Sequence, residues 1–141
     1  MHELKRGLWH WTAAHPQWTL GQPWPHEVSS YAIDDGSRLL LQDGRYYAAG
    51  DDLGLGIEVF PGREHNDVAL WLERAGAVIA GDTLVDFGRG LQIADWLREK
   101  VTRAQVADGL CPLLELPVEV VLPAHGPPAD RVALERALLA V

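Results

Sequence analysis

The stretch "FPGREHNDVALWLERAGAVIAGDT", residues 60–83, decides how this chain is expected to fold. Pro61 and Gly62 predict a turn. The alternation of apolar and polar residues in "DVALWLE" then predicts a half-buried strand, and the continuously apolar "AVIAG" predicts a central one. This second strand runs directly into Gly81 and Asp82. An acid placed where a buried strand ends raises the question of whether the stretch is half of a metal site.

The rest of the chain predicts a sheet layered with helices, which is an α/β fold. The expected strands are "LKRGLWHWT" at 4–12, "EVSSYAID" at 27–34, "SRLLLQD" at 37–43, "IEVF" at 57–60 and "VEVVL" at 118–122. The expected helices are "QIADWLREK" at 92–100, "TRAQVADGLCPLLEL" at 102–116 and "DRVALERALLAV" at 130–141, because apolar residues there recur at helical spacing. Asp130 suits the N-cap of the last helix, and Pro112 is expected to kink or shorten the helix before it.

Length and composition indicate one domain spanning residues 1–141. The chain has 48% apolar and 23% charged residues, which is ordinary for a globular protein. Its net charge of −8 argues against nucleic acid and against an anionic membrane surface as partners. Cys111 is the single cysteine, so an internal disulfide and a cysteine-based zinc site are both excluded. A cytoplasmic location is the default expectation, and no segment predicts a membrane span.

Two short motifs share one design. Gly81-Asp82 follows the apolar strand "AVIA", and His125-Gly126 follows the strand "VEVVL" through Pro123-Ala124. A side chain that can bind metal therefore comes just after each buried strand, where a stiff backbone can hold it over an open edge. Each motif alone is more often an ordinary turn than a ligand.

Together and in this order, three segments resemble the metallo-β-lactamase superfamily. They are "VSSYAIDDGSRLLLQDG", "PGREHNDVALWLERAGAVIAGDTL" and "VVLPAHG". The resemblance covers roughly residues 4–130 and implies an αββα sandwich with one or two metals at one rim and metal-assisted hydrolysis. It places Asp82 at the bridging carboxylate and His125 at the last imidazole.

Other family positions are altered here. The family's His-x-His-x-Asp-His segment is absent, and the interval between Asp43 and His65 is too short for the strands and helices that it holds in the family. The resemblance therefore implies a shortened αββα sandwich. In the family's Gly-His-Thr turn this chain places Arg63 at the ligand position and Glu64 at the threonine, so His65 falls two residues late.

The ligand count leaves three hypotheses for this rim. The first is a binding or structural module without metal, in which Arg63 pairs with Asp82 and keeps the rim organised. The second is a residual hydrolase that holds one divalent metal such as zinc with Asp82, His125 and either His65 or Asp67. The third is that Asp82 and His125 are ordinary turn residues. Because a hydrolytic zinc site needs three protein ligands, the readings without metal are favoured.

Further residues are weaker candidates. Asp51, Asp52 and Asp86 are only helpers for a cation. The four tryptophans of the first 24 residues are expected to pack in the core or in a lid, although a small-molecule ligand remains open. A sandwich that has lost strands and helices exposes apolar sheet, so a homodimer is expected to cover that surface.

Overall fold

The computed structural model describes residues 1–15, 17–23, 25–34, 39–41, 53, 56–64, 67–97 and 100–140. The chain divides into two compact units, residues 1–45 and 46–141, and each unit is described by itself. The single domain spanning residues 1–141 stays a prediction. No helix within the described residues is both long and apolar enough to cross a bilayer.

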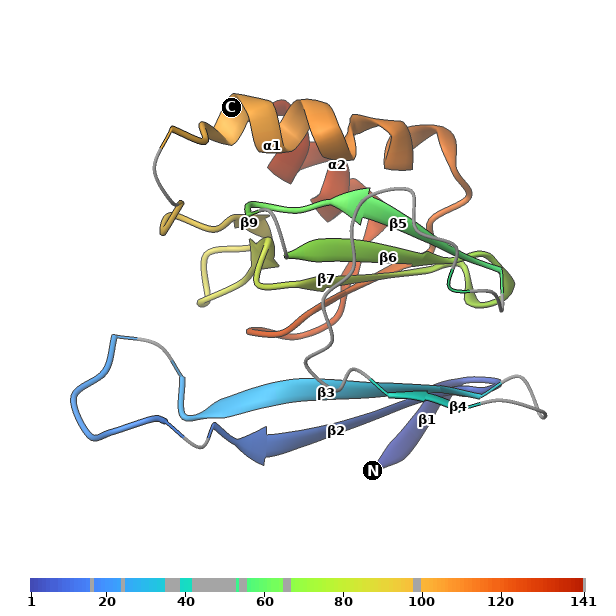
Figure 1. Ribbon diagram of the computed structural model, residues 1–141, viewed down its shortest axis with the longest axis horizontal. Coiled ribbons are helices and arrows are strands. Elements are labelled where there is room, and N and C mark those ends of the chain that lie inside the picture. The colour runs from blue at the N-terminus through green and yellow to red at the C-terminus, as the bar shows by residue number, and fades with distance from the viewer. Residues whose placement is uncertain are drawn as a thin grey trace. The chain divides into compact units, whose positions relative to one another are not determined.

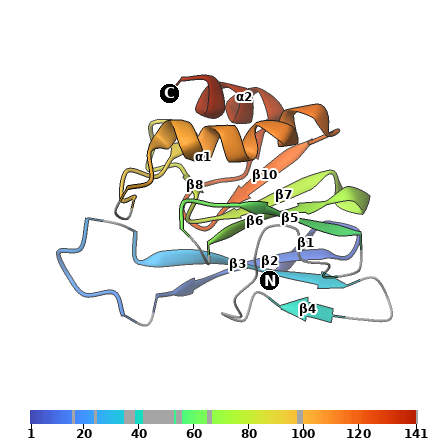
Figure 2. The same ribbon diagram turned by 45° about the horizontal axis from the view of Figure 1, so that its top comes forward.

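The first unit contains a four-stranded antiparallel sheet (Figure 2). Its strands, in spatial order, are β1 (His2–Lys5), β2 (Leu8–Ala14), β3 (Glu27–Asp34) and β4 (Leu39–Leu41). The prediction of one strand over residues 4–12 is wrong, because the chain turns at Arg6 and Gly7 and folds back into a hairpin. Polar residues beside a glycine favour such a turn, and the apolar pattern alone does not show where it comes.

The second unit is built on a five-stranded sheet with the order β11-β10-β7-β6-β5. These strands are β5 (Ile57–Pro61), β6 (Val68–Leu72), β7 (Ala77–Gly81), β10 (Val120–Pro123) and β11 (Ala129–Asp130). A short 3₁₀ turn, η1 (Glu73–Ala75), joins β6 to β7. Only the β7–β10 pair is parallel, and the other three pairs are antiparallel.

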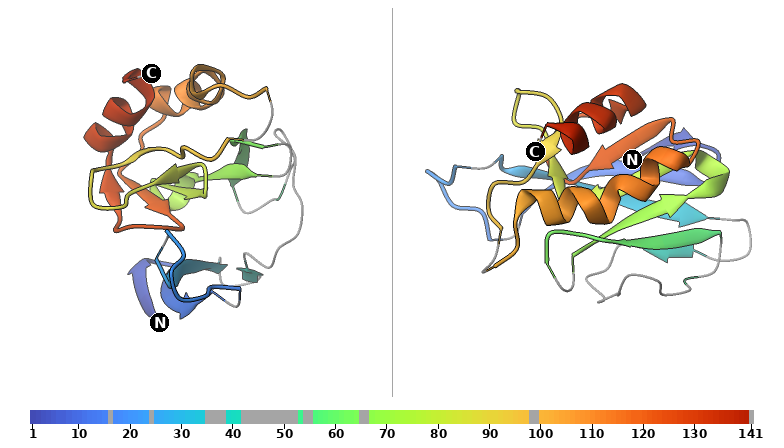
Figure 3. Two further views of the ribbon diagram at one scale, coloured as in Figure 1. Left: turned by 90° about the vertical axis from the view of Figure 1, so that its left-hand side faces the viewer. Right: turned by 90° about the horizontal axis from the view of Figure 1, so that it is seen from above.

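Two helices cover one face of this sheet (Figures 1 and 3). Helix α1 (Arg103–Leu110) begins with a capping box made by Thr102 and Gln105, and it passes into the 3₁₀ helix η2 (Cys111–Glu115) where Pro112 ends the α-helical pattern. Helix α2 (Arg131–Leu139) has Asp130 as its N-cap, as the sequence predicts. The predicted α/β class is therefore confirmed.

The helix predicted at residues 92–100 is not observed among the described residues 92–97. Gln92 and Ile93 instead form β9, which pairs with β8 (Leu84–Val85). The helical spacing of the apolar residues there is real, but Ile93 is fully buried through strand pairing and contacts with the core. Tertiary contacts thus override the local pattern.

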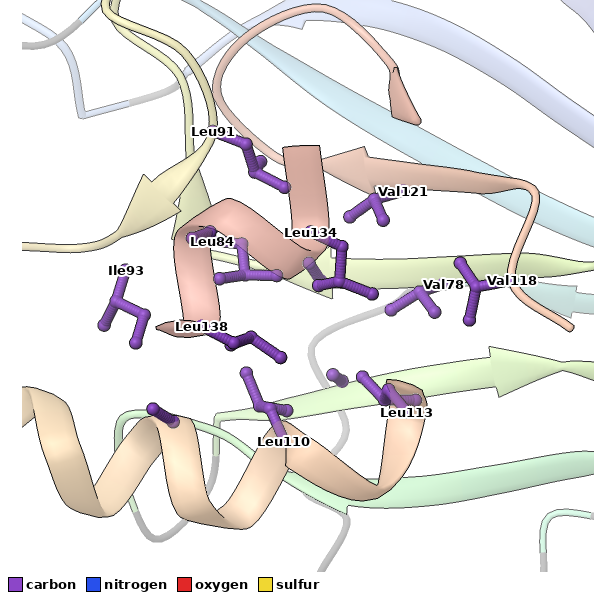
Figure 4. Close-up of a cluster of buried hydrophobic side chains, with 14 of the residues drawn as sticks. Val78, Leu84, Leu91, Ile93, Leu110, Leu113, Val118, Val121, Leu134 and Leu138 are labelled. Atoms are coloured by element: carbon purple, nitrogen blue, oxygen red, sulfur yellow. The ribbon is translucent and has the colours of Figure 1, made fainter. Parts of the chain in front are cut away.

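The core of the second unit lies between the helices and the sheet (Figure 4). Leu110 and Leu134 from the helices pack in one cluster with Trp71 and Val78 of the sheet and with Ile93. The prediction that "DVALWLE" forms a strand is confirmed, but residues 69–72 are buried on both faces, so the strand is not half-buried. Strand β7 is likewise buried at every position, as expected for a central strand.

Candidate functional site

Asp82 and His125 come from neighbouring parallel strands and lie side by side. Asp82 follows β7 and His125 follows β10, so both lie at the same edge of the sheet. The amide of Ala124 donates to the carbonyl of Gly81 at 2.9 Å, which ties the two loops together. Nε2 of His125 is 3.5 Å from Oδ1 of Asp82. The imidazole is buried, whereas 39% of the Asp82 side chain is exposed.

The guanidinium of Arg63 lies among three carboxylates, and we call these four side chains the Arg63 cluster. Nη1 donates to Glu64 Oε1 at 2.7 Å, and Nη2 donates to Asp82 Oδ2 at 3.4 Å. Nε is 2.9 Å from Asp67 Oδ2, an ion pair by distance that is not aligned as a hydrogen bond. The pairing of Arg63 with Asp82 considered from the sequence is therefore confirmed. One cation facing three carboxylates leaves an excess of negative charge.

Thr83, which was not predicted as a site residue, positions this cluster. Its side chain is fully buried, and Oγ1 accepts from the backbone N–H of Arg63 at 3.2 Å while donating to Asp67 Oδ2 at 2.9 Å. Gly62 permits this approach, because a Cβ there would lie 2.5 Å from the same Oγ1 and 2.2 Å from the carbonyl oxygen of Asp67. In the sequence, the indication of this role is that a hydroxyl-bearing residue directly follows Gly81-Asp82.

Aromatic side chains flank the cluster. The ring of Trp96 lies 5.7 Å from Cζ of Arg63, and the carbonyl of Trp96 accepts from Nη1 at 3.1 Å. Phe87 lies between Trp96 and His125, with ring centroids 5.7 Å from each. Trp96 is 41% exposed, so its ring shields the guanidinium on one side and meets solvent on the other. Sequence reasoning missed Trp96 because it placed this residue in a helix.

Burial raises the pKa of Asp67 to about 6. Loss of hydration is the largest cause, and it outweighs the hydrogen bond from Thr83 and the charge of Arg63, both of which lower the pKa. Asp82 and Glu64 raise it further by like-charge repulsion. The raised pKa of Asp67 is consistent with a single guanidinium that is shared among three carboxylates and does not neutralise all of them.

The other helpers considered from the sequence do not join the cluster in the described residues. Asp86 caps its own turn, since its Oδ1 accepts from the backbone N–H groups of residues 88, 89 and 90 at 2.7–3.1 Å. Its backbone N–H donates to the carbonyl of His125 at 2.9 Å, so Asp86 supports the histidine loop. His65, Asp51 and Asp52 lie outside the described residues.

The metal-binding side chains among the described residues do not form a complete metal site. Asp82 and His125 supply a carboxylate and an imidazole, both of which suit zinc. In the part of the chain that the structure describes, no three His, Cys, Asp or Glu side chains gather closely enough to hold a metal ion. The guanidinium of Arg63 also lies beside the carboxylate that a cation would approach, and like charges repel at this range.

No known protein-family model and no curated protein matches this chain. Solved structures do. The metallo-β-lactamase FIM-1 from Pseudomonas aeruginosa, in its mono-zinc form, is similar with a TM-score of 0.66 and 12% identity, over 96% of this chain and 91% of that chain. A metallo-β-lactamase from Erythrobacter litoralis has a TM-score of 0.65 and 13% identity, over 97% of this chain and 89% of that chain.

A third similar structure, TTHA1623 in a di-iron-bound form, is 28% identical with a TM-score of 0.50. The match covers 66% of this chain and 46% of TTHA1623, so this chain spans less than half of that protein. The two metallo-β-lactamases match nearly the whole chain at low identity, and such a likeness concerns the fold. The chain therefore has a metallo-β-lactamase-like α/β fold, as the order of its motifs predicts.

Proposed function

We propose that this chain is a degenerate metallo-β-lactamase-like protein whose metal-dependent hydrolase activity has been lost or much reduced. The observation that carries the proposal is the ion pair between Arg63 and Asp82, with 3.4 Å between Nη2 and Oδ2. Asp82 is the residue that the resemblance places at the bridging carboxylate. A guanidinium held against this carboxylate opposes the approach of a divalent cation.

The number of donors supports the same proposal. A hydrolytic zinc site normally has three protein ligands and one open position for water. Asp82 and His125 provide two donors, and the third predicted ligand, His65, lies outside the described residues. Asp67 is close by, but its Oδ2 already accepts from Thr83 and faces Arg63. A site limited to the two donors of the described residues would bind metal weakly, because affinity follows the number and geometry of ligands.

A residual hydrolase with a single metal is the second candidate function. It is favoured by the short distance of 3.5 Å between His125 Nε2 and Asp82 Oδ1, which brings two donors to one place. In this reading His65 or Asp67 supplies the third ligand, and the metal, when bound, supplies an activated water molecule. The chain's own contribution would be to hold Asp82 and His125 at the sheet edge.

Metal content measured by elemental analysis separates the two candidates. The protein should be purified without an affinity tag or chelator and re-measured after incubation with zinc, manganese or iron. We expect far less than one metal per chain, with no change in Asp82→Ala or His125→Ala. Near-stoichiometric metal that is lost in both variants would contradict the proposal and establish the residual hydrolase.

The matched control is Asp108→Ala, which removes one carboxylate from the exposed surface of α1. It tests whether any loss of metal reflects the lower charge of the protein. A cytoplasmic location and a small-molecule ligand stay predictions.

A further inference from the structure

We propose that the guanidinium of Arg63 takes the structural role of a metal ion at this rim, so that the single change Arg63→His converts the rim into a metal site. The inference rests on the proposed function, since it assumes that the natural chain holds no metal there.

The carboxylates of the Arg63 cluster need a cation. Glu64 and Asp67 belong to the segment between β5 and β6, whereas Asp82 follows β7. Bringing three carboxylates together in a partly buried place is unfavourable, because they repel one another and lose hydration. Arg63 compensates for part of this with contacts of 2.7, 2.9 and 3.4 Å to the three groups. A divalent metal at the same place would provide the same compensation.

Residue 63 is held by its backbone as well as by its charged side chain. Its backbone N–H donates to Oγ1 of the buried Thr83, the residue next to Asp82. The guanidinium also donates to the carbonyl of Trp96 and lies 5.7 Å from that ring. With 12% of the Arg63 side chain exposed, the cation has little freedom to leave the cluster. A different side chain at position 63 would begin at the same backbone position, whose N–H lies 3.2 Å from Oγ1 of Thr83.

Histidine at position 63 would supply the missing donor. Arg63→His removes the repelling charge and adds an imidazole near Asp82 and His125, whose own donor atoms are 3.5 Å apart. Three such ligands are the number that a hydrolytic zinc site uses. Histidine is shorter than arginine, and a zinc ion with bonds of about 2.0–2.1 Å would bridge the remaining distance between the imidazole at position 63 and the donors of Asp82 and His125.

The test titrates zinc chloride into tag-free natural protein and into Arg63→His, followed by calorimetry and thermal unfolding. We expect Arg63→His to bind one zinc per chain at least about 100-fold more tightly than the natural protein. Its unfolding midpoint should rise by roughly 5–10 °C at a zinc concentration about 100-fold above Kd. The natural protein should show almost no shift.

Two control variants show whether the gain depends on this site. Arg103→His places a histidine beside Asp95, whose Oδ1 now lies 3.2 Å from Arg103 on an exposed surface, and it should behave like the natural protein. The double variant Arg63→His, Asp82→Asn should lose the tight site. Zinc binding by Arg63→His that is no tighter than by Arg103→His would overturn the inference.

Two other substitutions of Arg63, measured by thermal unfolding with no metal added, test the structural role separately. Arg63→Met keeps a long apolar stem but removes the charge, and it should lower the unfolding midpoint by several degrees. Arg63→Lys should recover part of this loss because it restores a cation. An unchanged midpoint in Arg63→Met would overturn the structural role. Stoichiometric zinc in the natural protein, lost in Asp82→Ala, would instead contradict the proposed function, so the two failures are distinguishable.

Discussion

The hydroxyl of Thr83 donates a 2.9 Å hydrogen bond to the carboxylate of Asp67, although one residue follows β7 and the other precedes β6. The same hydroxyl accepts from the backbone N–H of Arg63. One buried side chain thus joins the two segments that carry the Arg63 cluster. The two hydrogen bonds of Thr83 hold Arg63 and Asp67 in place, although neither charged side chain is fully buried.

Replacing Thr83 with valine should destabilise the protein by about 1–3 kcal/mol, because the partly buried N–H of Arg63 and carboxylate of Asp67 each lose their hydrogen-bond partner. Valine has nearly the same shape, so packing is conserved. Thr83→Ser keeps the hydroxyl and should lose less stability. Urea unfolding of the three proteins measures the difference, and equal stability of the natural protein and Thr83→Val would show that the hydroxyl does not hold the segments together.

The pKa of Asp67 predicts a pH dependence of stability. The unfolded carboxyl titrates near 3.8 and the folded one near 6, so between these values only the folded state keeps the proton. The free energy of unfolding should therefore fall as pH rises from about 4 to about 6, by on the order of 2–3 kcal/mol from this group. Stability present below pH 4 is lost above pH 6.

Asp67→Asn should flatten this part of the pH profile, because an amide does not titrate. Urea midpoints measured at several pH values between 4 and 7 give the comparison. Asp108→Asn, which changes an exposed carboxylate, is the matched control and should keep the natural slope. A profile of Asp67→Asn parallel to that of the natural protein would rule out a raised pKa for Asp67.

Gly109 of α1 packs against Pro61 of β5. A Cβ at this position would be 2.8 Å from Cγ of Pro61, and a proline ring has little freedom to move aside. Gly109→Ala should therefore destabilise the protein, even though alanine is the better helix former by about 1 kcal/mol. Asp108→Ala, on the exposed side of the same helix, should be neutral or slightly stabilising. Thermal unfolding of the two variants measures the effect. A higher unfolding midpoint in Gly109→Ala than in the natural protein would show that α1 can move away from β5.

Arg131 joins the start of α2 to the end of η2. Its Nη1 donates to the carbonyl of Leu116 at 2.5 Å, its Nη2 donates to the carbonyl of Leu114, and its Nε donates to Glu135 at 3.1 Å. Arg131→Lys should lower the free energy of unfolding by about 1–2 kcal/mol, because one ammonium group cannot reach all three acceptors of the planar guanidinium. Glu135→Gln removes only an exposed pair within one helix and should cost about 0.5 kcal/mol or less. Similar urea midpoints for both variants would contradict this assignment.

The homodimer expected from the sequence stays a prediction. Trp9 and Trp11 alternate along β2 and therefore lie on one face of the first unit's sheet. A second copy would cover apolar surface of this kind. Light scattering at micromolar concentration should give twice the mass of the chain, and Trp11→Arg should reduce it to that of a monomer. A monomeric natural protein would mean that the chain covers this face itself.

Local patterns predicted several elements correctly, for physical reasons that lie within a few residues. The apolar run of β7 and the alternation in β6 specify strands, β5 and β10 are also strands as predicted, and Asp130 and Pro112 mark helix ends. The Gly81-Asp82 and His125-Gly126 motifs follow strands that are neighbours in the sheet. Sequence alone also indicated that Arg63 could pair with Asp82.

Contacts between distant residues decided the rest. Gln92 and Ile93 pair with β8 despite their helical spacing, and this brings Trp96 to the guanidinium of Arg63. Thr83 gains its role only because the loops after β5 and β7 meet. The sequence by itself determined the strands β5, β6, β7 and β10 and the chemistry that follows β7 and β10. The tertiary structure alone decided that the guanidinium paired with Asp82 also reaches Asp67 and the carbonyl of Trp96, because that arrangement depends on long-range packing and shared burial.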